Sequence, residues 1–166
     1  MYSKKYTIVS YLFVTILGVL CHFAYDWSGE NFIVGMFCPV NESTWEHLKL
    51  AFFPMLLLTL WDLSHNFKDN ADFLPARTMG IFLAMAFIVT AFYTYIGVIG
   101  KTIDPINIVI YFIGIAFGFW MERLVFGKTK WFTPALATLL LIAMSLAFVI
   151  LTYLAPDVGI FKDPLA

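Results

Sequence analysis

The most polar stretch of a very apolar chain holds most of the residues that could do chemistry. Residues 41–49 read NESTWEHLK, so two carboxylates and a histidine stand between apolar segments. Upstream, His22 and Asp26 are four residues apart and would share one face of a helix. Imidazole nitrogens and carboxylate oxygens are ligands that zinc and similar divalent metals accept. The sequence leaves the cofactor open, and a divalent metal such as zinc is one candidate, for which the ligands would come from these residues: His22, Asp26, Glu42, Glu46 and His47.

A wider set of polar residues is predicted to line the same cavity as a ligand-binding site: His22, Asp26, Asn41, Glu42, Ser43, Glu46, His47, Tyr93 and Tyr95. Other interpretations remain open for some members. Ser43 and Glu46 have the spacing of a helix-capping box, which would explain both residues without any function. His47 could make a structural hydrogen bond to Glu42 or Asp26. A Ser43–His47 nucleophile pair is disfavoured, because no glycine elbow surrounds the serine.

Composition identifies the solvent in which these residues must lie. Of 166 residues, 61% are apolar and only 13% are charged, against roughly 45–50% and about 25% in soluble domains. A chain of this size cannot bury so much apolar surface in water, since about 30% of its unfolded area would stay exposed. An ordinary cytosolic enzyme and a disordered chain are therefore excluded. The net charge of −1 lacks the basic excess of a nucleic-acid binder, so the predicted partner is the lipid bilayer.

Long runs without charged residues predict membrane-spanning helices. A span needs about 20 mostly apolar residues, each adding about 1.5 Å across the membrane. We therefore predict an all-α polytopic transmembrane bundle, a single integral membrane domain over residues 1–166. Its five spans are expected at approximately residues 6–25, 43–63, 77–99, 105–121 and 133–154.

The second predicted span differs from the others. Only 12 uncharged residues separate Lys49 from Asp62, so this helix can cross only if its polar beginning lies within the membrane. Residues 31–42 are too short to cross and are expected to form a re-entrant or interfacial element before it. Ionisable groups at membrane depth cost roughly 2.5–3.5 kcal/mol each and usually face a cavity or a partner. This cost favours a functional cavity, open to the outer face.

Lys and Arg predict the orientation. With five spans and a cytoplasmic N-terminus, seven of them fall on inner segments and three on outer ones, as the positive-inside rule requires. The C-terminus would then be extracytoplasmic, in a multi-pass protein of the cell membrane.

Several local features carry further expectations. Thr133-Pro134 and Asp104-Pro105 are expected to begin helices, each with a capping side chain before the proline. Gly114 and Gly118 predict close helix packing. Asp62 and His65 are expected at a solvated helix end, and Glu122 with Arg123 as an interfacial ion pair. Cys21 and Cys38 could be paired in a disulfide or remain buried thiols.

The central motif also carries a resemblance. Residues 39–50, PVNESTWEHLKL, followed by Phe53-Pro54, resemble the signature of a family of small multi-pass bacterial membrane proteins without assigned function. The upstream His22-x-x-x-Asp26-Trp27 and the Tyr93-Thr94-Tyr95 segment fit the same pattern. The resemblance implies where a site would lie and implies no activity.

Three function classes follow from the sequence. The first is a binding or transport module whose outer-facing acidic and histidine cavity takes a cation, a proton or a small polar ligand. The second is an intramembrane metal-dependent hydrolase or transferase that acts on a lipid. The third is a structural membrane subunit. The sequence leaves open whether the protein is an enzyme, which ligand or lipid it takes, and whether it forms a homo-oligomer.

Overall fold

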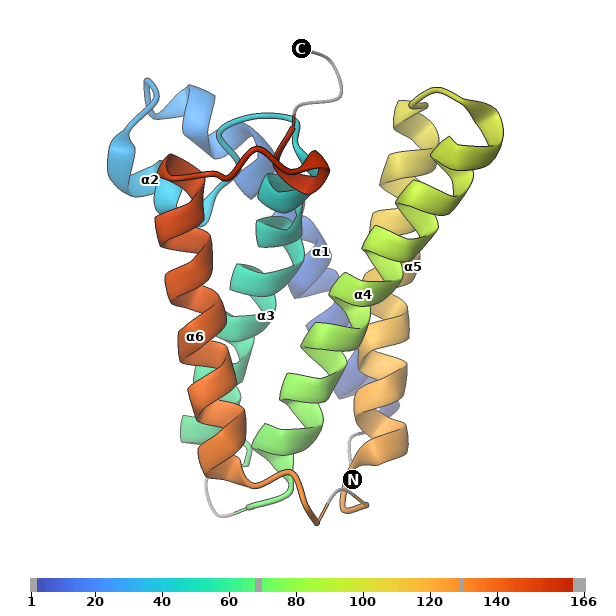
Figure 1. Ribbon diagram of the computed structural model, residues 1–166. Helices are drawn as coiled ribbons and strands as arrows, with labels where there is room; N and C mark the ends of the chain where they lie inside the picture. The colour runs from blue at the N-terminus through green and yellow to red at the C-terminus, as the bar shows by residue number, and fades with distance from the viewer. Residues whose placement is uncertain (1–2, 68–69, 129, 163–166) are drawn as a thin grey trace.

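The computed structural model describes residues 3–67, 70–128 and 130–162, and over these residues the chain is all helical. Figure 1 shows a bundle with the N-terminus at one end and the C-terminus at the other. The elements are α1 (Lys4–Trp27), α2 (Phe32–Phe37), α3 (Thr44–His65), α4 (Phe73–Ile99), α5 (Asp104–Val125), α6 (Pro134–Tyr153) and the short 3-10 helix η1 (Gly159–Phe161).

Four of the helices, α1, α4, α5 and α6, are long and apolar enough to cross a membrane. Their outward faces are apolar as well as their inward ones. Val98 of α4 is 83% exposed, and Leu139 of α6 is 61% exposed. A water-soluble bundle would bury such side chains, whereas hydrocarbon is a good solvent for them. These four apolar helices indicate insertion in a membrane.

Helix α3 is the central and most polar long helix. It contacts α1, α4 and α6 and runs along the bundle beside them (Figure 1). Twelve of its 22 residues are buried, including Glu46, Lys49 and Asp62. These three charged side chains are therefore surrounded by protein, where they can be paired. The prediction that this segment is a fifth span stays a prediction.

Helices α4 and α5 pack closely through small residues. A Cβ added to Gly118 would lie 2.8 Å from the Gly80 carbonyl oxygen, and one added to Gly80 would lie 2.8 Å from that of Gly118. A Cβ on Gly114 would meet Ile88 at 2.5 Å. The expected close packing at Gly114 and Gly118 is confirmed, because only glycine lets the backbones approach this far.

The helix starts follow the predictions in part. Thr133 caps α6, its side chain accepting a hydrogen bond from the Leu136 amide. The prediction for Asp104 was wrong by one position. Asp104 is already the first residue of α5, and Ile103 precedes it without a side-chain cap.

The N-terminal end of the bundle contains a buried charge network that overturns two expectations. Asp62 and Arg77 are fully buried, and Glu122 is 1% exposed. The Arg77 guanidinium donates to Glu122 at 2.8 Å and to Asp62 at 3.1 Å. Asp62 is therefore not at a solvated helix end, and Glu122 pairs with Arg77 rather than with its neighbour Arg123. Tertiary pairing across α3, α4 and α5 replaces the local pairing that the sequence suggested.

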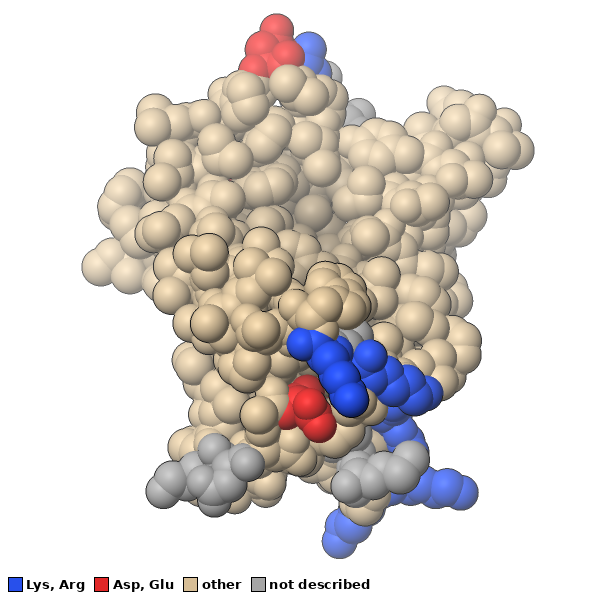
Figure 2. Space-filling model, turned by 60° about the horizontal axis from the view of Figure 1, so that its bottom comes forward, with Lys and Arg blue, Asp and Glu red and all other residues tan. Residues whose placement is uncertain are grey.

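Lys and Arg side chains gather around this same end of the molecule. Figure 2, which brings the bottom of Figure 1 forward, shows most of the visible basic side chains there. The N-terminus of α1 and the end of α5 lie at this end (Figure 1).

Candidate metal centre

At the opposite end, three of the five candidate ligands meet. His22 comes from α1, Glu42 from the loop before α3, and His47 from the first turns of α3. The Nε2 atoms of the two histidines lie 3.2 Å apart. His47 Nε2 is 3.3 Å from a Glu42 carboxylate oxygen, and His22 Nε2 is 4.0 Å from it. One ligand atom from each residue thus lies within 4.8 Å of the others.

Local sequence explains how Glu42 and His47 are positioned. The Ser43 side chain caps α3 by accepting from the Glu46 amide. Asn41 Oδ1 accepts from the Ser43 amide at 2.9 Å, a side-chain turn typical of asparagine. The predicted cap is confirmed for Ser43, but Glu46 does not return its side chain to complete the box. The tight turn over 41–43 places the Glu42 carboxylate beside His47, 3.3 Å from its Nε2.

A disulfide positions the third ligand. Cys21 and Cys38 are bonded, with their Cα atoms 5.3 Å apart. Cys21 directly precedes His22, and Cys38 begins the loop that reaches Glu42. The bond therefore ties the α1 segment that carries one ligand to the loop that carries another. Of the two alternatives for these cysteines, the structure has the disulfide.

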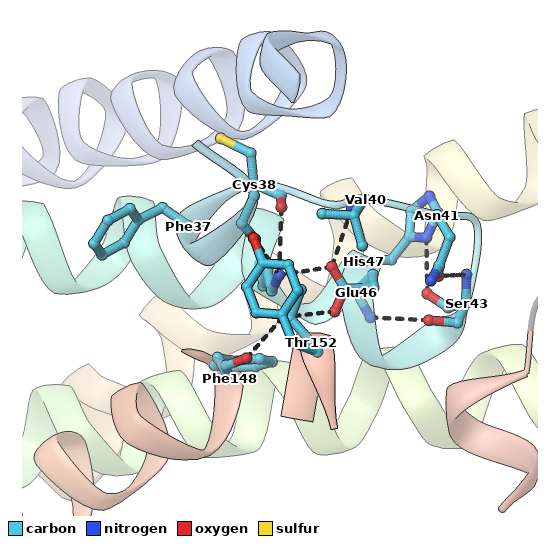
Figure 3. A network of polar contacts seen from close by, with 12 residues as sticks. Phe37, Cys38, Val40, Asn41, Ser43, Glu46, His47, Phe148 and Thr152 are labelled. Carbon is cyan, nitrogen blue, oxygen red and sulfur yellow. Dashed lines mark hydrogen bonds and ion pairs between the residues drawn. The ribbon is translucent and has the colours of Figure 1, made fainter. Parts of the chain in front are cut away.

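The pairing of Glu46 separates it from the other candidate ligands. Glu46 and Lys49 form a buried ion pair at 2.6 Å, and the Lys49 ammonium also donates to the Gly35 carbonyl at 2.8 Å. Glu46 further accepts from the Val40 amide and from Thr152 Oγ1, each at 3.0 Å. Figure 3 shows this network between the loop, α3 and α6. The carboxylate oxygens of Glu46 bind Lys49, the Val40 amide and Thr152. Glu46 is therefore not brought to the histidines.

His47 has an orientation suited to binding a metal. Its Nδ1 lies 3.0 Å from the Ser43 carbonyl oxygen. A carbonyl only accepts, so Nδ1 must carry a proton and the neutral ring then has its lone pair on Nε2. Metal-binding histidines commonly fix their tautomer through such a hydrogen bond. Nε2 is the atom that points toward His22 and Glu42.

A proton or a metal can occupy the space between these groups. When Nε2 also carries a proton, the His47 imidazolium donates to Glu42, and this hydrogen bond lowers the pKa of the Glu42 carboxyl below its ordinary value of 4.5, against the opposing effect of partial burial. The carboxylate is therefore ionised at neutral pH and available as a ligand. Protons and metals compete for such sites, because a coordinating imidazole must be deprotonated.

Two of the three separations between candidate ligand atoms fit a tetrahedral ion. With metal–ligand bonds of about 2.0–2.1 Å, ligand atoms around tetrahedral zinc lie about 3.3 Å from one another. The 3.2 Å and 3.3 Å separations at His47 match this spacing. The 4.0 Å separation of His22 and Glu42 is longer, and the Glu42 side chain, 46% exposed, has room to turn.

Comparison with known proteins places the chain in a family. A family of unknown function (DUF6512) has a model that matches residues 1–166. The protein belongs to this family. No curated protein and no solved structure matches the chain. The resemblance to a family without assigned function is thereby confirmed, and any function for this DUF6512 protein must be argued from its geometry.

The remaining predicted residues of this family member lie outside the ligand group. Asp26 is exposed near the end of α1, and it is absent from the group formed by the described residues. Tyr93 accepts a hydrogen bond from Thr44 at 3.3 Å. Tyr95 donates to Asn107 and accepts from the Ile103 amide, so it braces the connection between α4 and α5. Of the five candidate ligands, only His22, Glu42 and His47 are brought together.

A pocket of about 100 Å³ adjoins the ligand group and shares Glu42 and His47 with it. The other lining residues come mainly from the facing surfaces of α3, α4 and α5: Thr44, Leu50, Ile88, Phe92, Thr102, Asp104, Asn107, Ile110 and Tyr111. The sequence-based site residues included none of the α5 members. Asp104 and Asn107, three residues apart at the start of a helix, were the available signal.

Proposed function

We propose that this membrane protein binds a divalent transition metal of the zinc class through His22, Glu42 and His47. The observation that carries the proposal is the convergence of two imidazole nitrogens and a carboxylate oxygen at nearly tetrahedral spacings. Two histidines and a glutamate are a ligand set found in zinc enzymes.

The exposure of the three side chains supports a site at which a metal ion can exchange with the surrounding solution. The side chains of His22 and His47 are 33% and 31% exposed, and that of Glu42 is 46% exposed. The two other charge clusters, around Arg77 and around Lys49, are almost fully buried. A metal could reach the ligand group from outside without opening the bundle.

We further propose that the site faces the extracytoplasmic side. Disulfides persist in oxidising compartments, and the Cys21–Cys38 bond lies at the site. The basic residues that gather at the opposite end (Figure 2) suit the cytoplasmic side. In this arrangement α3 also crosses the membrane, which makes five spans in all. The N-terminus is then inside and the C-terminus outside. Residues 31–42, which contain α2, form an interfacial or re-entrant element.

Metal titration of the purified protein tests the proposal. Protein stripped with a chelator in detergent is titrated with Zn²⁺ by calorimetry, and bound metal is counted by mass spectrometry. We expect one Zn²⁺ per chain. His22→Ala, His47→Ala and Glu42→Gln should each weaken binding by at least tenfold. His65→Ala is the matched control, because His65 lies in the last turn of α3, at the other end of the helix from His47. Its ring stacks on Trp61, with the ring centroids 3.9 Å apart.

Two results would contradict the proposed metal site. A folded wild-type protein that binds no stoichiometric Zn²⁺, Co²⁺ or Ni²⁺ would contradict it. So would ligand variants that bind as tightly as His65→Ala. Thermal unfolding of each variant, measured without metal, shows whether a loss of binding reflects a loss of fold.

A further inference from the structure

We propose that the metal is catalytic and that the adjoining pocket takes the carbonyl end of a neutral acyl ester or amide, which the metal-bound water hydrolyses. This inference rests on the proposed function, since it needs the metal at His22, Glu42 and His47.

The number of protein ligands is the first step of the argument. Zinc is four-coordinate, and structural sites fill all four positions with protein ligands, whereas catalytic sites use three and leave one for water or substrate. In the part of the chain that the structure describes, the ligand group has three members. Asp26 and Glu46, the two other carboxylates near it in sequence, are not members of the group. The fourth position is therefore left for a water molecule.

The pocket provides the space where a reacting group would sit. It is lined by two of the three ligands, Glu42 and His47, so a molecule inside it lies next to the metal. A volume of about 100 Å³ exceeds the roughly 10–15 Å³ that one water needs on the same measure. An ester or amide group with its first carbon atoms fits this space, whereas a whole lipid does not.

The walls of the pocket are amphipathic. Leu50, Ile88, Phe92 and Ile110 supply apolar surface from three helices. Thr102, Asp104 and Asn107 supply polar groups where α5 begins. A molecule with a polar end and an acyl chain matches this arrangement.

Charge selects a neutral polar end. A divalent metal contributes +2 at the pocket, and the Glu42 and Asp104 carboxylates contribute −2 together. These acidic side chains offset the charge of the metal, so an anionic group such as a fatty carboxylate or a phosphate is attracted less than it would be by the metal alone. A neutral carbonyl can approach the metal through its oxygen. Asp104 can accept a hydrogen bond from a hydroxyl or amide N–H on the leaving part of the molecule.

The proposed reaction is a hydrolysis in which all atoms are accounted for. His22, Glu42 and His47 would hold a zinc ion, which would lower the pKa of a bound water to about 7 and so supply hydroxide at neutral pH. The hydroxide oxygen forms a bond to the carbonyl carbon, and the bond from that carbon to the ester oxygen or amide nitrogen breaks. The leaving alkoxide or amine takes a proton that came from water. The products are a carboxylic acid and an alcohol or amine, and no oxidant or reductant is needed.

A spectroscopic test separates the pocket from the metal site. Cobalt replaces zinc in the purified protein, and its visible absorption bands report the ligands around it. Octanohydroxamic acid, which is neutral in solution and loses its N–OH proton when it binds a metal through two oxygens, is then added in detergent. We expect the cobalt spectrum to change.

Matched variants on α5 locate the probe. Ile110→Trp fills the pocket and should weaken hydroxamate binding at least tenfold while cobalt binding is unchanged. Ile108→Trp, on the exposed face two residues away, should leave both unchanged. If cobalt binds but octanohydroxamic acid leaves its spectrum unaltered, the pocket inference is overturned and the proposed function stands. If cobalt does not bind, the proposed function itself fails.

A hydrolysis assay tests the chemistry. A fluorogenic octanoyl ester and the matching octanoyl amide are given to the zinc-loaded protein. We expect turnover of at least one of them, lost in Glu42→Gln and His47→Ala and retained in His65→Ala. If the protein binds cobalt and the hydroxamate but hydrolyses neither compound above the rate of the metal-free protein, the hydrolytic step is wrong.

Discussion

The two ends of the bundle each gather charged and polar residues, but in opposite ways. At the N-terminal end, Arg77, Asp62 and Glu122 are buried and paired. The rings of Phe73 and Phe119 lie 5.0 Å and 5.5 Å from the guanidinium carbon. At the other end, His22, Glu42 and His47 are partly exposed and contain no permanent cation.

The difference indicates different tasks. Asp62 accepts from Arg77, from Asn66 at 2.7 Å and from the Tyr6 hydroxyl, so α1, α3 and α4 are bound to one carboxylate. Such a network supplies its own counter-charge and holds helices in register. Ligand atoms of His22, Glu42 and His47 lie close together, and we propose that a cation from solution completes this group. The Arg77 cluster pairs its charges within the chain, whereas the group of His22, Glu42 and His47 is the proposed binding site.

Removing Arg77 should produce the largest effect. Arg77→Met leaves Asp62 and Glu122 buried without their cation, which typically costs about 3–5 kcal/mol. We expect a marked loss of thermal stability or of folded yield in detergent. Arg123→Met is the matched control, because Arg123 is half-buried and donates a long hydrogen bond to Thr7, at 3.4 Å. Equal stability of the two variants would contradict the structural role of the Arg77 cluster.

Zinc should stabilise the folded protein only through the group of His22, Glu42 and His47. A ligand at 100 times its Kd adds about 2.7 kcal/mol to the free energy of unfolding, so the melting temperature of wild-type protein should rise. The rise should disappear in His47→Ala and persist in His65→Ala, as followed by thermal unfolding with and without Zn²⁺. A rise of the same size in His47→Ala would place the metal elsewhere.

Replacing Glu46 should separate structure from binding within the same motif. Glu46→Gln removes the charge opposite the buried Lys49 ammonium and should cost about 1–3 kcal/mol of stability, while Zn²⁺ still binds at one per chain. Glu42→Gln, four residues earlier, should do the reverse. Chemical or thermal unfolding and metal counting on the two variants give the comparison. Loss of zinc from a folded Glu46→Gln protein would show that Glu46 is a ligand after all.

Reducing the disulfide should have the smallest effect of the four. The Cys21–Cys38 bond joins the segments that carry His22 and Glu42, so breaking it frees their relative positions. We expect zinc affinity to fall about tenfold, equivalent to about 1.4 kcal/mol, while the Arg77 cluster is untouched. Calorimetry with and without reductant measures the change. The Cys21→Ser/Cys38→Ser double variant should bind weakly in both conditions, and a reductant effect that persists in it would exclude the disulfide as the cause.

Local patterns of the sequence predicted a good part of this architecture. Apolar runs predicted α1, α4, α5 and α6 as membrane helices, because length and hydropathy need no partner to be recognised. Ser43 and Thr133 were predicted as caps from the residues that follow them. The same patterns misplaced Asp104 by one residue, because a proline is accepted at either of the first two helical positions.

Pairing between distant segments was the part that local patterns could not supply. Asp62 meets Arg77 15 residues away, and Glu122 meets Arg77 45 residues away. Sequence analysis assigned Asp62 to solvent and Glu122 to Arg123, since those were the nearest options. Among the polar residues of the NESTWEHLK stretch, Glu42 and Glu46 have the same chemistry. The difference comes from Lys49, which binds the Gly35 carbonyl of α2 and pairs with Glu46. Glu42 instead lies beside the histidines.

The sequence by itself therefore determined the apolar surroundings, the four long apolar helices and the segment that holds the candidate site. These follow from hydrophobic length and from capping, which depend on neighbours along the chain. The tertiary structure alone decided which three ligands converge, which carboxylates are neutralised by Lys49 and Arg77, and that Cys21 pairs with Cys38. Electrostatic pairing and coordination depend on distances of a few ångströms between segments, and those distances exist only once the helices have packed.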